Sequence, residues 1–74
     1  MKNDYKNSIS NFPCNLKQLR LAENLTQKQV AEYLGITIQS YYAYEAGIAL
    51  PTFVNFISLC EFFDITPNEL LDIS

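Results

Sequence analysis

The amino-acid sequence predicts a small all-α domain of five helices. Apolar residues recur three or four positions apart in successive segments, which is the spacing of a helix face. Glycine, proline and helix-capping residues separate these segments, so the helices are expected to be short and joined by short loops. The sequence contains no alternating strand pattern and no internal repeat.

Length and composition suit one small globular domain. The chain has 74 residues, and its 49% hydrophobic content is high enough to form a core. Cys14 and Cys60 are the only cysteines and no signal peptide precedes them, so we expect two free thiols in a cytoplasmic protein. Without histidine, two cysteines make no zinc site, and we expect no metal and no cofactor. No apolar run approaches the roughly 20 residues of a membrane span.

The N-terminal segment differs from the rest of the chain. Residues 1–11 are polar, rich in Asn and without a period, so we expect a flexible arm in front of a domain that spans residues 12–74. A first helix is predicted by apolar residues at helical spacing, namely Phe12, Leu16, Leu19 and Ala22. Pro13 suits the first turn of that helix, and Asn24 suits its end because Asn tolerates left-handed backbone angles.

Two short helices are predicted next, separated by a glycine. Thr26 and Gln29 form a capping box, and Gly35 ends the helix that they begin. The buried face of that helix is expected to contain Val30, Ala31 and Leu34. Thr37 caps the following helix, which ends at Gly47. Tyr41 and Tyr44 of this helix are expected in the core.

Two more helices complete the predicted domain. The chain restarts at Pro51 and Thr52, and apolar residues at helical spacing follow, namely Phe53, Phe56, Ile57, Cys60 and Phe63. The last helix begins at "TPNELL", where Thr66 and Glu69 form a second capping box and Pro67 lies in the first turn.

The order of these motifs resembles a known family. "LKQLRLAENLTQKQVAEYLGIT", then "YEAG", "LPTF" and "ITPNELL", is similar to the helix-turn-helix regulators of the phage repressor and Cro type. The resemblance covers residues 12–72 without a gap. It implies a compact, lambda-repressor-like helix-turn-helix domain that binds double-stranded DNA as a homodimer.

The resemblance also implies roles for particular residues. The helix from about Ile38 to Ala46 would lie in the major groove, with Gln39 and Ser40 at base edges. Gln27, at the start of the preceding helix, would bond the phosphate backbone. The candidate DNA-binding residues are Gln27, Lys28, Ile38, Gln39, Ser40, Tyr42 and Ala43.

The resemblance further implies an internal ion pair between Arg20 and Glu45, which would join the first helix to the reading helix and match the charge of Glu45 near DNA.

Simpler interpretations stay open for several of these residues. Arg20 could be a surface charge, and Gln39 could be an exposed side chain without a ligand. Tyr42 either faces phosphate or belongs to a contact surface.

Charge is distributed unevenly along the chain. Residues 1–28 contain all five Lys and Arg residues and two carboxylates, for a net charge of +3. Residues 29–74 contain six carboxylates and no Lys or Arg, for −6, which gives the overall −3. Related sequences usually have polar or basic residues where this chain has Ile38, Ala43, Ala46, Ile48 and Ala49. We therefore expect a weak electrostatic grip on DNA.

The loop after the reading helix is unusually apolar. Ile48, Leu50 and Val54 are predicted to form an interface, either with a second copy or with another protein, because contiguous exposed apolar residues mark protein contacts. In the alternative, Leu50 and Phe53 fold back onto the core. Two functions follow: a DNA-binding transcriptional regulator, or a protein-interaction module that has the same fold and reduced DNA binding. An enzyme is not expected, because no catalytic motif is present.

Overall fold

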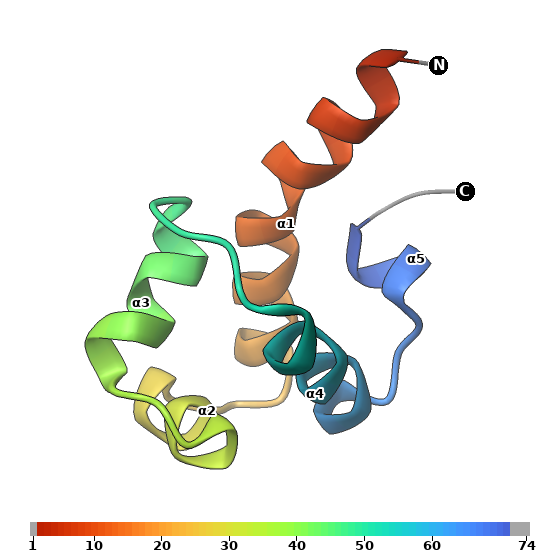
Figure 1. The fold of residues 1–74 in the computed structure, drawn as a ribbon. Coiled ribbons are helices and arrows are strands. Elements are labelled where there is room, and N and C mark those ends of the chain that lie inside the picture. The colour runs from red at the N-terminus through yellow and green to blue at the C-terminus, as the bar shows by residue number, and fades with distance from the viewer. Residues whose placement is uncertain (1, 72–74) are drawn as a thin grey trace.

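The computed structural model describes the backbone of residues 2–71 and the side chains of residues 11–71. Within that range it contains five helices and no strand, which confirms the predicted all-α fold. The helices are α1 (Lys2–Ala22), α2 (Gln27–Leu34), α3 (Ile38–Ala46), α4 (Phe53–Phe63) and α5 (Pro67–Leu71). Helix α1 runs through the middle of the bundle, with α2 and α3 on one side and α5 on the other (Figure 1).

The first helix is longer than the sequence predicts. It begins at Lys2 and not near Phe12, so Pro13 lies inside the helix and not in its first turn. Residues 2–12 contain no glycine and no proline, so nothing in their sequence stops the helix from growing toward the N-terminus. Pro13 removes one intrahelical hydrogen bond and crowds the carbonyl four residues before it, but the helix continues through it. Residues 2–11 are therefore a helical segment, and the flexibility of this segment stays a prediction.

The core is formed where the five helices meet. Its buried residues come from every helix: Phe12, Leu16, Val30, Ala31, Tyr41, Tyr44, Leu59, Cys60 and Leu70. The rings of Phe12 and Phe56 lie 6.0 Å apart, which joins α1 to α4. Cys60 is buried and Cys14 is exposed, and neither forms a disulfide. Burial raises the pKa of the Cys60 thiol, as expected for a small core residue.

Side chains and backbone angles set the helix boundaries. The predicted capping boxes are present: Gln29 N donates to Thr26 Oγ1 at 3.1 Å, and Glu69 N donates to Thr66 Oγ1 at 3.1 Å. Thr37 and Thr52 cap α3 and α4 in a similar way. The first four helices each end at a residue with left-handed angles: Asn24 (φ 57°), Gly35 (φ 73°), Gly47 (φ 76°) and Asp64 (φ 54°).

Candidate nucleic-acid interface

Helices α2 and α3 pack against each other and meet at the bend around Gly35. Tyr41 and Tyr44 anchor α3 in the core, and both are buried as the sequence predicts. The other side of α3 faces solvent. Ile38, Gln39, Ser40 and Tyr42 are exposed on it, and Ala43 is half-buried.

The first turn of α3 keeps polar groups available to a ligand. Ser40 N donates to Thr37 Oγ1 at 3.0 Å, which caps the helix. The Thr37 hydroxyl in turn donates to Ser40 Oγ at 2.9 Å. Since the Ser40 oxygen accepts that bond, its own proton remains available to an outside acceptor. The exposed Gln39 amide beside it offers a donor and an acceptor.

The first turn of α2, the other helix of the pair, contains two more candidate residues. Lys28 is exposed there, while Gln27 is half-buried. Gln27 Nε2 donates to Glu45 Oε1 at 3.1 Å, so the amide is held by α3 before any ligand arrives. A side-chain amide nitrogen carries two protons, and one remains after this bond. Gln27 is thus oriented at the N-terminus of α2, where the helix favours an anion.

A hydrogen-bonded ion pair lies under this surface. Arg20 Nε donates to Glu45 Oε2 at 2.6 Å, and Arg20 Nη2 donates to Glu45 Oε1 at 3.0 Å. The Tyr41 hydroxyl also donates to Glu45 Oε2. Arg20 Nη1 donates to the backbone carbonyl of Leu25 at 2.8 Å, in the segment between α1 and α2. The network therefore joins α1, the start of α2 and α3.

The network sets the charge state of its members. Burial alone would raise the pKa of Glu45, but hydrogen bonds from Arg20, Tyr41 and Gln27 outweigh it and hold the pKa below the usual range. The hydrogen bond to Glu45 raises the pKa of Arg20. Burial, together with the bond to Glu45, raises the pKa of Tyr41. Glu45 is therefore ionised and fully paired at neutral pH.

The surface beside α3 is apolar. The exposed fractions are 74% for Ile48, 59% for Leu50, 78% for Phe53 and 70% for Val54. Leu50 and Phe53 therefore do not fold back into the core, contrary to the alternative reading of the sequence. We call these four residues the apolar patch.

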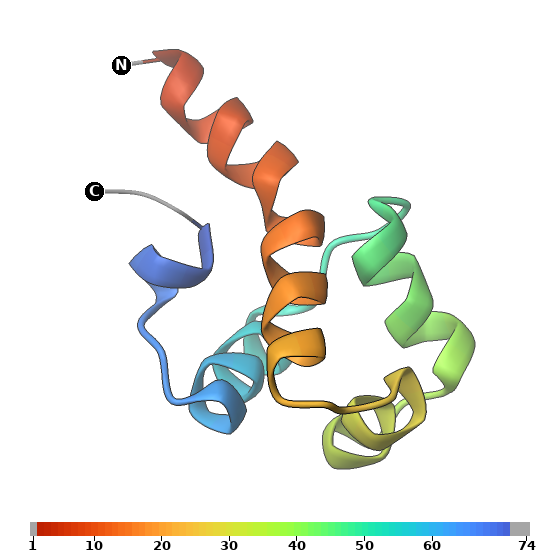
Figure 2. The ribbon, with the colours of Figure 1, turned by 180° about the vertical axis from the view of Figure 1, so that it is seen from behind.

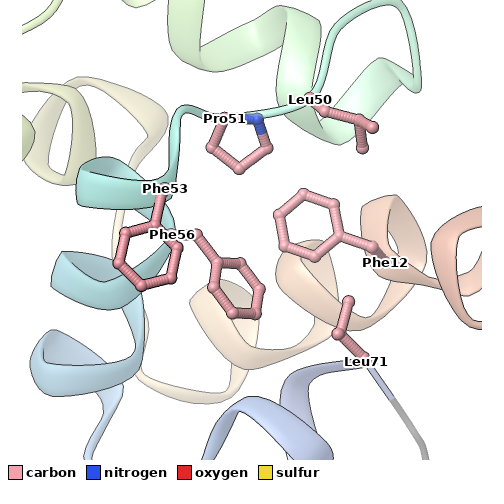
Figure 3. Close-up of a pocket in the computed structure, with 6 residues that line it drawn as sticks. All are labelled: Phe12, Leu50, Pro51, Phe53, Phe56 and Leu71. Atoms are coloured by element: carbon pink, nitrogen blue, oxygen red, sulfur yellow. The ribbon is translucent and has the colours of Figure 1, made fainter.

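An open pocket of about 230 Å³ lies next to the patch and shares two residues with it. Figure 3 shows the six side chains that surround this pocket, which we call the apolar groove: Phe12, Leu50, Pro51, Phe53, Phe56 and Leu71. They come from α1, the loop before α4, α4 itself and the end of α5. No charged residue lines the groove.

Comparison with known proteins places the chain in a family. The sequence profile described as "Helix-turn-helix" matches residues 16–70. The chain belongs to the helix-turn-helix family. The matched range begins inside α1 and ends inside α5, so it includes all of α2, α3 and α4.

Several curated relatives of this helix-turn-helix chain are transcriptional regulators by name. The cryptic phage CTXphi transcriptional repressor RstR of Vibrio cholerae is 40% identical over 55 residues, which are 74% of this chain and 49% of RstR. The uncharacterized HTH-type regulator YqaE of Bacillus subtilis is 38% identical over 60 residues, 81% and 52% of the two chains. The activator BcrR of Enterococcus faecalis is 38% identical over 56 residues, 76% and 28%.

The chain spans about half the length of the first two of these relatives and less of the third. No solved structure matches it significantly.

Some contacts within the helix-turn-helix unit have no signal in the sequence. The bonds from Tyr41 and Gln27 to Glu45 are two of them. Two others join pairs of helices. Asn55 Nδ2 of α4 donates to the Tyr44 hydroxyl of α3 at 3.1 Å, and Asn15 Nδ2 of α1 donates to the Leu70 carbonyl of α5 at 3.0 Å. Each depends on a side-chain rotamer, and the residue pattern does not specify it.

A metal site and a membrane-spanning helix are both absent from the part of the chain that the structure describes. Among the side chains of residues 11–71, no three His, Cys, Asp or Glu residues come together in a group that could hold a metal ion. No helix within residues 2–71 is both long and apolar enough to cross a membrane.

Proposed function

We propose that this chain is a DNA-binding transcriptional regulator whose helix α3 reads the major groove. The observation that carries the proposal is the exposed first turn of α3, where Gln39 and Ser40 have free hydrogen-bonding groups. A glutamine at such a position can bond adenine with two hydrogen bonds. The regulator names of RstR, YqaE and BcrR support the same function. We propose a binding role in the cytoplasm and no enzymatic one.

The proposed contact surface has a polar part and an apolar part. Gln27 and Lys28 face phosphate, with Gln27 oriented by Glu45. Ile38 and Ala43 contact thymine methyl groups, and Tyr42, at 52% exposure, lies beside them. Few cations take part, because Arg20 is occupied by Glu45 and residues 29–74 contain no Lys or Arg. Affinity then depends more on direct contacts than on counterion release.

We further propose that the chain acts as a homodimer through the apolar patch. Two reading helices must lie about 34 Å apart to enter successive major grooves on one face of DNA. Ile48 and the rest of the patch directly follow α3, so an interface there would fix the spacing of the two helices. Exposed apolar residues in this number are typical of a protein contact.

Selection from a library of random DNA duplexes at low salt tests the DNA-binding function. We expect enrichment of a sequence with two half-sites, and a clear loss of binding for Gln39→Ala combined with Ser40→Ala. Both residues are exposed, so this double variant should stay folded. Glu32→Gln on the exposed surface of α2 is the matched control. If no sequence is enriched over the starting library, the proposal is wrong.

A second function is supported by the apolar patch itself. A protein-interaction module with the same fold would use the patch for a different protein and would have reduced DNA binding. The selection separates the two, because the interaction module yields no enriched duplex while changes in the patch still abolish complex formation.

A further inference from the structure

The N-terminal part of α1 extends beyond the bundle. Figures 1 and 2 show residues 2–11 projecting past the other four helices in both views. A helix of 21 residues is about 32 Å long, close to the 36 Å longest dimension of the whole molecule. Most of the stability of a helix in a protein comes from packing of its apolar face. Packing against another surface would therefore stabilise this segment.

The apolar groove lies at the base of the projecting segment. Phe12 lines the groove, and it is the first residue after residues 2–11. In the sequence, Tyr5 and Ile9 precede Phe12 and Leu16 at spacings of four, three and four residues, which is a helical repeat. They are the only aromatic or branched aliphatic residues between positions 2 and 11.

Charge favours an encounter between these two parts of different molecules. Residues 48–71, which supply most of the groove and its surroundings, contain Glu61, Asp64 and Glu69 and no Lys or Arg. All three carboxylates are on exposed residues. Residues 2–11 contain Lys2 and Lys6 against Asp4, for a net charge of +1, and residues 1–28 together carry +3. The N-terminal helix of a second copy is thus attracted to the acidic segment 48–71, which supplies five of the six groove residues.

We propose that the apolar groove binds residues 2–11 of α1 from a second copy of the chain, in a reciprocal exchange. Each copy then supplies one groove and one helical segment, as a two-fold symmetric interface requires. This inference rests on the homodimer of the proposed function and identifies the segment that covers its apolar surface. It also gives residues 2–11 of α1 a packing partner.

Cross-linking between two variants that each carry one new exposed cysteine, beside the buried Cys60, tests the exchange. In a Cys14→Ser background, Asn7→Cys is placed in one chain and Val54→Cys in the other, and the two are mixed under mild oxidation without DNA. Because each chain carries only one of the new thiols, an Asn7–Val54 bond can form only between copies. Leu21→Cys replaces Asn7→Cys in the control, since Leu21 is exposed near the far end of α1.

We expect the mixed disulfide dimer on a denaturing gel, in a yield about tenfold or more above the Leu21→Cys control, because docking raises the local thiol concentration. Phe53→Glu in the chain that carries Val54→Cys should reduce the yield of the mixed dimer to the control level. High salt should reduce the yield in part. Phe53 is 78% exposed, so the change leaves the core intact.

Three results would overturn the exchange. Val54→Cys linking mainly to itself would mean that the patch pairs with the patch. A dimer seen by sedimentation without the mixed disulfide would mean that the copies meet at another interface. A chain that stays monomeric at millimolar concentration would exclude both the exchange and the proposed homodimer. The duplex selection is a separate measurement, so failure of the exchange is distinguishable from failure of DNA binding.

Discussion

Arg20 and Glu45 are 25 residues apart in sequence, yet two hydrogen bonds of 2.6 and 3.0 Å join their side chains. Only 10% of the Arg20 side chain and 4% of the Glu45 side chain are exposed, so water screens the pair little. The pair connects α1 to α3, and the Tyr41 hydroxyl and the Gln27 amide donate the other hydrogen bonds to the carboxylate.

Breaking this pair from one side should destabilise the protein strongly. Arg20→Met leaves a buried carboxylate without its cation, which costs about 3–5 kcal/mol, against about 0–1 kcal/mol for an exposed pair. For a domain of this size we expect Tm to fall by more than about 10 °C in thermal unfolding followed by circular dichroism. Lys17→Met, which removes an exposed cation from the same helix, is the control. An unchanged Tm for Arg20→Met would show that the pair contributes nothing.

Stability should fall in acid because of Glu45. Its pKa is lower in the folded protein than the value near 4.3 of an unfolded chain. The resulting stabilisation is fully present above pH 4.3 and is lost as the pH falls through the lower folded value. We expect urea unfolding to show a smaller gap between wild type and Glu45→Gln at pH 3 than at pH 7. A gap that is equal at both values would contradict the depressed pKa.

The apolar patch should control self-association. Leu50→Glu combined with Val54→Glu places two charges on exposed positions, so the helix content should not change. The dimer dissociation constant should rise about hundredfold or more, since burial of each side chain contributes about 1.5 kcal/mol or more. Sedimentation equilibrium measures the effect, with Leu21→Glu as the exposed control. Equal association by wild type and the double variant would remove the patch from the interface.

Gln39 should determine one base of the DNA site. Gln39→Ala is expected to weaken binding to the best selected duplex by about 1–3 kcal/mol and to relax the preference at one base pair. Titration of the variant against all four bases at each position of the site measures both effects. Weaker binding without any change in preference would place Gln39 on the phosphate backbone.

Lys28 should act on phosphate and not on bases. Lys28→Ala is expected to weaken binding to every duplex alike and to reduce the slope of log K against log salt by about one for each bound subunit. For wild type we expect a slope shallower than about −5, because the chain has too few free cations to release more counterions. Filter binding over a range of salt concentrations gives both slopes. A steeper wild-type slope would mean that Lys2 and Lys6 also contact DNA.

Local residue choice predicts most of the fold. Capping threonines and left-handed residues define the ends of α2, α3 and α4, and those signals act over a few residues. The start of α1 was not predictable in this way. The polar composition of residues 2–11 indicates a loose arm, whereas helix growth depends on the absence of a stop signal and on the helix already formed at Phe12.

The candidate site was predictable to a smaller extent. The register places Arg20 and Glu45 on neighbouring helices, and they meet there. The same resemblance implies a phosphate contact for Gln27, and it gives no sign that the amide also donates to Glu45. Side-chain bonds of this kind depend on rotamers chosen among several partners within reach, which sequence spacing does not determine.

The left-handed helix ends have a consequence for the evolution of the chain. A Cβ atom added at Gly35 would meet no atom within 4 Å, and one added at Gly47 would lie 3.5 Å from Pro13 Cγ. The two glycines are therefore needed for their positive φ angle and not because a Cβ atom would lack space. Asn24 and Asp64 adopt a similar angle although they have side chains. Since the bends and the core lie apart from the outer side of α3, mutations can replace the outward-facing residues there with little effect on folding. A lineage with this fold can lose or change its ligand through successive neutral substitutions.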